Sequence, residues 1–225
     1  MEKILEVFCS RSFENDINKG MLYYDYDFPA ERVLSYIQQI VEISIEQLLF
    51  AIEQWEDEEQ IQSGDIFQFS NLNDATYRIC HVIKAADNPG ITFLEAGKLL
   101  LNDGKVRKNT AMVKYGENHL KTAESLGLLY ELTHVYFLSC IGYVTDLLND
   151  NQREKLLLRL VLRNKLVRAL YLASKNGTVN LRQFFYMLSD STYTRRRSNV
   201  RSILSILEKN KEFDFSQFIS AISFD

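Results

Sequence analysis

Glycine and proline are scarce in this chain, which has nine glycines and two prolines among its 225 residues. Both residue types interrupt regular structure and form tight turns, so their scarcity argues against a sandwich or barrel built from many short strands. Hydrophobic residues account for 46% and charged residues for 25%, which is typical of a globular protein and excludes a largely disordered chain. The sequence therefore predicts a folded, mainly α-helical protein.

Targeting and cysteine patterns point to a reduced compartment. No apolar stretch reaches the roughly 18 residues that a membrane-spanning helix needs, and the first ten residues lack the basic-then-apolar order of a secretory signal. Cys9, Cys80 and Cys140 are far apart and odd in number, which excludes a disulfide framework and a paired-cysteine metal site. We expect a cytoplasmic protein without membrane segment or cofactor, whose three thiols are reduced packing residues.

Charge divides the chain into two unequal parts. Residues 1–70 carry 15 acidic and 4 basic residues, whereas residues 71–225 carry 15 acidic and 22 basic residues. Within the second part, residues 153–201 hold 12 lysines and arginines against two acidic residues, Glu154 and Asp190. This asymmetry is typical of an acidic module joined to one that meets a polyanion. The alternative is that the basic cluster is an ordinary solvated helix surface.

Residues 1–70 are predicted to form an acidic helical module. Between Pro29 and Trp55, apolar residues recur at three- and four-residue spacing, which predicts one amphipathic helix that ends at the acidic residues 56–59. Pro29 suits the first turn of such a helix. The aromatic-rich run 21–28 is compatible with a short strand, a packing arm or a partner-binding surface.

Residues 71–150 are predicted to form a compact unit of three helices and a hairpin. Asn73 or Asp74 can cap a helix that reaches residue 86, and Thr92 with Glu95 forms a capping box for a second helix. A third helix runs from about residue 110 to 126, where Gly127 supplies a left-handed C-cap. The apolar runs 128–132 and 135–139 then predict a hairpin. This is the order of elements in a winged helix, which presents its third helix to a DNA groove.

Residues 151–225 repeat part of this order. Helices are predicted over residues 163–174, 180–188 and 193–208, with an Asn-Gly turn at 176–177 and a capping loop at 189–192. This second unit lacks an obvious hairpin, although residues 213–216 are compatible with one short strand. We therefore expect a second, winged-helix-like domain.

Two stretches carry a resemblance to a known group of proteins. Residues 115–128 read YGENHLKTAESLGL, and residues 191–202 read STYTRRRSNVRS. They resemble the tandem winged-helix DNA-binding modules of bacterial restriction-modification and phage-defence proteins, over about residues 74 to 210. In that group a YGENHxKxAxxLGL-like third helix precedes the first wing, and an sTxxRR-like helix start marks the second module. This chain differs in carrying Ile203 and Leu204 where the second motif usually continues with a tryptophan.

The resemblance implies sequence-specific recognition of double-stranded DNA, and the placement of basic residues agrees with it. Guanidinium groups can bond phosphate or the edge of guanine, while hydroxyls and ammonium groups suit phosphate. Base readout is expected from Arg195, Arg196, Arg197, Asn118 and His119. Phosphate contacts are expected from Lys105, Lys108, Lys114, Lys121, Arg201, Thr192 and Thr194. The alternative for His119 is a core or capping role, and the Tyr-Gly-Glu-Asn string then only sets the helix start.

Catalytic motifs are weak in this sequence. The nearest match to a metal-dependent nuclease is Asp87 with Asp103-Gly-Lys105, which falls in loops rather than on paired strands. No phosphate-binding glycine loop, zinc-protease motif or nucleophile elbow is found. We expect the chain to be the recognition component of a restriction or antiviral defence system, without catalysis of its own. A separate nuclease, ATPase or methyltransferase subunit would then act at the bound site in the nucleoid.

Three other functions fit the same residues. A transcriptional regulator of such a system needs the same folds but no enzymatic partner, a winged-helix adaptor binds protein instead of DNA, and a nuclease is the weakest fit. The module at 1–70 is expected either to pack on the first winged-helix domain or to mediate dimerisation or partner docking. In the second case Trp55, Tyr23, Tyr24 and Tyr26 would be the anchors.

Overall fold

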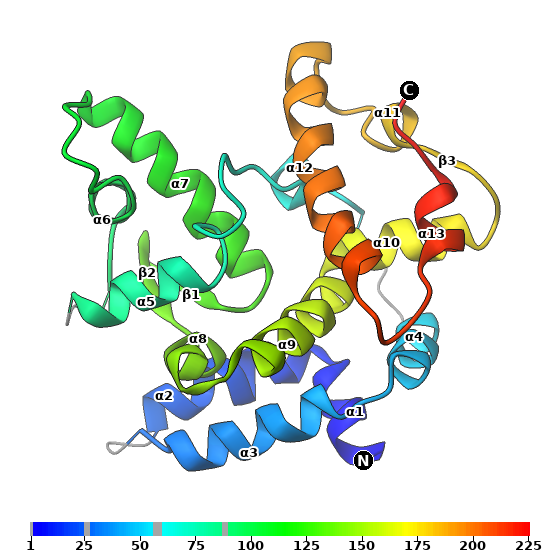
Figure 1. Ribbon diagram of the computed structural model, residues 1–225, viewed down its shortest axis with the longest axis horizontal. Coiled ribbons are helices and arrows are strands. Elements are labelled where there is room, and N and C mark those ends of the chain that lie inside the picture. Colours follow the sequence, from blue (N-terminus) through cyan, green and yellow to red (C-terminus); the bar gives the residue numbers. More distant parts are fainter. Residues whose placement is uncertain (1, 25–27, 56–59, 87–89) are drawn as a thin grey trace.

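The computed structural model describes residues 2–24, 28–55, 60–86 and 90–225, and it is mainly helical, as predicted. Thirteen α-helices and two small two-stranded sheets are found in these residues (Figure 1). Within the described ranges, no helix combines the length and the apolar character that crossing a bilayer requires.

The N-terminal helices correct one prediction, because the helix expected from Pro29 to Trp55 is broken into two. The side chain of Ser44 caps the second helix by accepting a hydrogen bond from the Gln47 N–H at 3.2 Å. Ile43, in the break, is buried, and its carbonyl accepts a 2.7 Å hydrogen bond from Arg159. The apolar spacing continues across the break and therefore hides it. The elements are α1 (Glu2–Phe8), π-helical η1 (Phe13–Lys19), α2 (Gly20–Tyr24), α3 (Ala30–Val41) and α4 (Ile45–Gln54).

The structure decides among the alternatives for the first part of the aromatic-rich run 21–28. Its start is helical, as α2, and Met21 is buried, so a strand is excluded for this part. Residues 25–27, including Tyr26, and the acidic residues 56–59 lie outside the described residues.

The middle of the chain has the predicted order of three helices and a hairpin. Thr92 and Glu95 form the capping box, and Gly127 has a φ of +76° after the third helix. The hairpin turn places Thr133 and His134 at φ values of 51° and 64°, as a two-residue type I′ turn requires. The elements are 3₁₀-helical η2 (Ser63–Asp65), α5 (Tyr77–Ala85), α6 (Phe93–Leu100), α7 (Asn109–Ser125), β1 (Leu129–Leu132), β2 (Val135–Leu138), α8 (Cys140–Val144) and 3₁₀-helical η3 (Thr145–Leu147).

The start of α5 differs from the prediction that Asn73 or Asp74 caps it. The helix begins at Tyr77, after a turn, and no side chain caps it. Asp74 is instead buried and accepts hydrogen bonds from Arg78 at 2.5 Å and from the Tyr115 hydroxyl at 2.6 Å. Its carboxylate therefore joins α5 to α7 rather than capping a helix.

The C-terminal part contains the longest helix and a short parallel strand pair. The predicted strand at 213–216 is wrong: these residues lead into α13, and the strand partner of β3 is β4, with Val179 opposite Ile222. The helix predicted over 180–188 is also shorter, because only residues 181–184 are helical. The elements are α9 (Asp150–Arg163), α10 (Lys165–Ser174), β3 (Val179–Asn180), α11 (Leu181–Phe184), α12 (Asp190–Lys209), α13 (Ser216–Ser220) and β4 (Ile222–Ser223).

Several polar side chains tie the first seventy residues to the rest of the chain. Asn18 is buried, donates to the Gly127 carbonyl at 2.7 Å and accepts from the Ile141 N–H at 3.1 Å. Arg163 donates to the Phe8 carbonyl at 2.7 Å. Helix α9 runs through the middle of the molecule and packs against α3, α4, α10 and α12 (Figure 1). The domain boundaries near residues 70 and 150 stay a prediction.

The three thiols are free, and we expect them to react slowly in the folded protein. Cys80 and Cys140 are buried, and burial raises the pKa of the Cys9 thiol from 9.0 to about 11. At pH 7 this shift lowers the thiolate fraction of Cys9 about 100-fold, and the thiolate is the reacting species. The pKa of Cys80 and of Cys140 is raised further, also by burial.

Titration of the folded protein with a chromogenic disulfide reagent should release the chromophore slowly at pH 7. In guanidinium, all three thiols should react rapidly. Fast labelling of the folded chain would contradict this.

Candidate nucleic-acid interface

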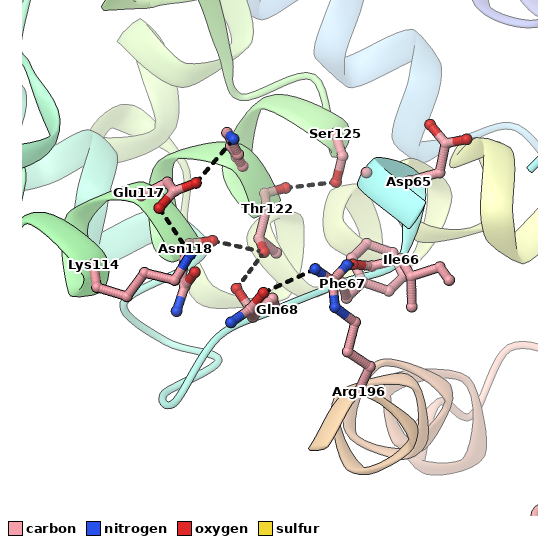
Figure 2. A pocket seen from close by; sticks show the side chains of 12 residues that line it. Asp65, Ile66, Phe67, Gln68, Lys114, Glu117, Asn118, Thr122, Ser125 and Arg196 are labelled. Atoms are coloured by element: carbon pink, nitrogen blue, oxygen red, sulfur yellow. Dashed lines mark hydrogen bonds and ion pairs between the residues drawn. The ribbon is translucent and has the colours of Figure 1, made fainter. Parts of the chain in front are cut away.

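A small cavity of about 100 Å³ lies between α7 and α12, and residues 64–68 pass between the two helices (Figures 1 and 2). Four of the predicted DNA-contacting residues line it: Lys114, Asn118, Lys121 and Arg196. The two helices that carry the sequence motifs are therefore neighbours in space, although about eighty residues separate them in the chain.

The α7 side of the cavity is one face of that helix. Lys114, Asn118, Lys121 and Ser125 recur at four- and three-residue spacing, which places them in one row. Glu117 lies beside the row and bonds both lysines, at 2.9 Å to Lys114 and 3.0 Å to Lys121. These bonds hold the pKa of Glu117 below its usual range. One carboxylate therefore offsets part of the positive charge of two lysines.

Arg196 forms the α12 side of the cavity and points inward (Figure 2). Its guanidinium donates to the carbonyls of Ser63 and Ile66, both at 2.6 Å, and to Oε1 of Gln68 at 3.0 Å. Its Nε is buried without a hydrogen-bond partner among the described residues, and burial lowers the pKa of Arg196. One turn further along α12, the Asn199 amide donates to the Phe69 carbonyl at 2.7 Å. Arg196 thus fixes residues 63–69 against α12 and is not free for base readout in this arrangement.

The other arginines of α12 have different surroundings. Arg195 is exposed, and its Nε donates only to the Ser191 carbonyl of its own helix, at 3.3 Å. Arg197 is half-buried and donates to the Phe224 carbonyl at 3.1 Å, while the exposed Arg201 lies 4.5 Å from the centroid of the Phe224 ring. Of the three arginines expected to read bases, Arg195 alone has an exposed side chain.

The two threonines lie at the start of α12, where they serve the helix itself. Thr194 is exposed, and its hydroxyl donates to the Asp190 carbonyl at 2.9 Å. The Thr192 hydroxyl accepts a 3.0 Å hydrogen bond from Ser189, the residue that caps α12. Both hydroxyls retain the capacity to accept further bonds, but Thr194 is the more accessible of the two.

His119 corrects the expectation that it reads bases, because it is completely buried. Its ring stacks on Tyr115 with centroids 4.0 Å apart, and the Asn71 N–H donates to Nε2 at 3.4 Å. Nδ1 therefore carries the proton of the neutral ring and donates to the Tyr115 carbonyl at 2.7 Å. Burial lowers the pKa of His119, which favours this neutral form. The alternative of a core histidine is the one that the geometry supports.

The remaining lysines lie at the free end of α7. Lys105 and Lys108 are exposed in the loop that joins α6 to α7, where Val106 is fully exposed as well. Asp103 in this loop pairs with Arg107, which holds the pKa of the carboxyl well below its usual range. Asp103 is thus occupied, and its suggested nuclease partner Asp87 lies outside the described residues. Among the residues that the structure places, no group of three potential metal ligands is found.

Gln68 and the backbone of residues 63–66 are the part of this site that the sequence analysis missed. Nothing in their local sequence marks them, because their role depends on Arg196, which follows about 130 residues later. Trp55 is a docking anchor only in the second of the two alternatives for residues 1–70. It is half-buried, and the Arg168 guanidinium lies 3.6 Å from its ring centroid.

Comparison of the chain with protein-family models, curated proteins and solved structures finds no match.

Proposed function

We propose that this protein binds double-stranded DNA and acts as the recognition component of a restriction or anti-phage defence system. The observation that carries the proposal is the meeting of α7 and α12, the helices of the two motifs, around one shared cavity. Both helices point their N-terminal ends toward the same side of the molecule, the upper side in Figure 1. A protein that inserts two helices into neighbouring stretches of a groove needs such a common face.

The order α5, α6, α7, β1 and β2 supports a winged-helix role for the first unit. Helix α6 packs closely against α7, and the hairpin follows directly, so α7 is the helix offered to DNA and the hairpin is the wing. Residue Gln68 lies against the C-terminal half of α7, where its carbonyl accepts a 3.2 Å hydrogen bond from the Thr122 hydroxyl, although Lys121 in this half is exposed. Lys108, which immediately precedes α7, and Lys114, in the N-terminal half of α7, are therefore the residues that contact the duplex.

The second unit contributes the start of α12. Arg195 and Thr194 are exposed in the second turn of this helix, where their side chains can reach phosphate. Arg195 is the base-reading candidate, whereas Arg196 holds α12 against residues 63–68. Arg201 lies farther along the helix and supplies a peripheral phosphate contact.

The catalytic step belongs, in this proposal, to a separate nuclease, ATPase or methyltransferase subunit. A transcriptional regulator would use the same surface without such a partner. Residues 1–70 then carry the docking or dimerisation function through parts of their surface that the rest of the chain leaves uncovered.

Replacing Lys108, Lys114 and Arg195 together by alanine should abolish most DNA binding. Each lost charge-assisted contact costs about 1 kcal/mol, so we expect affinity to fall about 100-fold. The slope of log affinity against log salt should become shallower by about 0.9 for each phosphate contact removed. The measurement is selection on randomised duplexes with the wild type, followed by fluorescence anisotropy on the enriched site from 50 to 200 mM salt.

The matched control removes the same three charges elsewhere. Lys3, Lys209 and Lys211 are exposed and do not line the cavity between α7 and α12, and their triple alanine variant should bind like the wild type. Equal losses in both variants would mean that only net charge matters, and would contradict a defined interface. Absence of any salt-dependent binding by the wild type would overturn the DNA proposal itself.

A protein-interaction adaptor is the second candidate. The pairing of Lys114 and Lys121 with Glu117 favours it, because these lysines are partly neutralised without any DNA. An adaptor would show neither an enriched DNA sequence nor a salt-dependent slope.

A further inference from the structure

A groove of about 500 Å³ lies between α9 and the C-terminal end of α12. Its inner surface is apolar and is formed by Leu157, Leu158 and Ile206. Leu157 and Ile206 are only half-buried, so the two helices leave part of this apolar surface in contact with solvent. The volume is within the range of sites that enclose a small molecule, so an aromatic side chain and part of its helix turn fit. The predicted DNA-contacting residues do not line this groove.

Two charged residues at the rim of the groove are already paired within the chain. Glu212 is bonded by Arg159 at 2.8 Å, and Lys155 lies 3.9 Å from Glu42. These pairs bring no net charge to the rim, because each joins one cation to one carboxylate.

The other charged residues that line the groove are Lys209, Lys211 and Glu154, all of them exposed. None of the three forms an ion pair or a side-chain hydrogen bond with the residues that the structure describes. Two free ammonium groups therefore lie at the rim with one free carboxylate. Such a groove, apolar inside and positively charged at its edge, favours an acidic segment with an apolar anchor.

The outer face of α4 has the complementary composition. Phe50 is 65% exposed, and Glu46 and Glu53 lie one turn before and one turn after it on the same face. Glu53 is bonded by Lys175 at 2.7 Å, whereas Glu46 forms no ion pair or side-chain hydrogen bond with any described residue. Aromatic side chains are enriched in protein interfaces, where they fill pockets of the partner. Phe50 thus offers an apolar anchor beside a free carboxylate.

We propose that Phe50 of one copy of this chain inserts into the groove of a second copy. The ring would pack on the apolar inner surface, and Glu46 would lie against Lys209 and Lys211. Helix α4 packs against α9, whose side chains form one wall of the groove, so the two surfaces belong to neighbouring parts of each copy. In a two-fold dimer each copy then gives its Phe50 and receives that of its partner.

The charge distribution of the chain favours this pairing over a contact between two α4 faces. Residues 1–70 carry 15 acidic and 4 basic residues, so two copies of this acidic part repel each other, whereas the groove belongs to the basic part of the chain. The contact rests on the dimerisation role proposed for residues 1–70, and it does not require DNA.

Sedimentation velocity of the full chain, from about 1 to 200 µM, should show a reversible monomer–dimer equilibrium. Phe50→Ala should raise the dissociation constant at least tenfold, because a buried aromatic anchor carries much of the energy of an interface. Tyr186→Ala is the matched control: it removes another aromatic side chain, 76% exposed and outside both α4 and the groove. This control should dimerise like the wild type.

Exchange of charges tests whether α4 meets the groove. Glu46→Lys alone, and Lys209→Glu with Lys211→Glu alone, should each weaken dimerisation severalfold, because like charges then face each other. The chain that carries all three substitutions should recover its affinity, since the acidic and basic sides have changed places. These side chains are exposed, so the substitutions leave the core intact.

Three results would overturn the proposal: a wild type that stays monomeric over the whole range, equal effects of Phe50→Ala and Tyr186→Ala, or no recovery in the charge-exchanged chain. Assemblies that grow beyond the dimer would contradict the two-fold contact. DNA affinity, measured well below the dissociation constant of the dimer, should be the same for Phe50→Ala and the wild type. Failure of dimerisation and failure of DNA binding are therefore separate outcomes.

Discussion

Alanine in place of Gly116 should destabilise the protein by at least about 3 kcal/mol. A Cβ atom at this position would lie 1.9 Å from the carbonyl oxygen of Phe93 and 2.9 Å from the backbone nitrogen of Gly97. Both neighbours are backbone atoms of α6, so no side chain can rotate away and the two helices must separate. Overpacking typically costs 1–3 kcal/mol, and a backbone clash belongs at or above the upper end. Urea unfolding followed by circular dichroism measures the effect.

Two glycine variants provide controls for that experiment. Gly64→Ala should change stability by less than about 0.5 kcal/mol, because no atom lies within 4 Å of its added Cβ. Gly97→Ala brings a Cβ to 2.0 Å from the Met112 carbonyl, at the same contact between α6 and α7. Its cost should therefore be similar, and the two costs should not add in the double variant. Near-native stability of Gly116→Ala would show that α6 and α7 are not packed so closely.

Arg159→Ala should cost about 2–5 kcal/mol, the usual result of truncating a large buried side chain and leaving a cavity. The Arg159 side chain is 2% exposed, and it donates to Glu212 at 2.8 Å and to the Ile43 carbonyl at 2.7 Å. Its removal leaves a cavity in the middle of the molecule and deprives the break between α3 and α4 of its hydrogen bond. The free energy of unfolding in urea is the quantity to compare.

A second variant separates the charge of Arg159 from its packing. Arg159→Met with Glu212→Gln keeps most of the side-chain volume and removes both charges. It also removes the Nε atom of Arg159, which is buried without a hydrogen-bond partner among the described residues. We expect this double variant to be clearly more stable than Arg159→Ala, because buried pairs replaced by apolar groups are often nearly neutral. Equal losses in both would show that the hydrogen bond to Ile43, rather than the cavity or the isolated charge, dominates. A loss below about 1 kcal/mol for Arg159→Ala would contradict the prediction.

Elements with local signals were predictable from the sequence, whereas elements set by distant partners were not. The Thr92–Glu95 capping box, Gly127 and the Thr133-His134 turn each depend on a few adjacent residues, and all were found where expected. The break before α4 has the local Ser44 cap, which the continuous apolar spacing hides, and it is also bonded by the distant Arg159, while β4 pairs with the distant β3. Neither partner is near in sequence, so periodicity alone could not reveal these features.

The candidate site likewise contains residues that the local pattern predicted and residues whose surroundings depend on distant parts of the chain. Periodicity placed Lys114 and Lys121 on α7, and their exposure agrees with a surface role. The run Arg195 to Arg197 looked uniform, but successive helix residues point about 100° apart, so one side chain is exposed and its neighbour Arg196 points into the molecule. His119 was ambiguous for a related reason, because its partners at Asn71 and Tyr115 decide between a buried and an exposed ring.

The bonds from Arg196 and Asn199 to residues 63–69 have a consequence for how a duplex would be read. They join α12 to a stretch of backbone that is itself bonded to α7 through Thr122, so we expect the two helices to keep a fixed separation. In the proposed DNA-binding role, two helices at a fixed separation would measure distance along the duplex as well as base identity. The number of base pairs between the two contacted stretches would then be part of the recognised sequence, and inserting a single pair there should abolish binding as thoroughly as changing a contacted base.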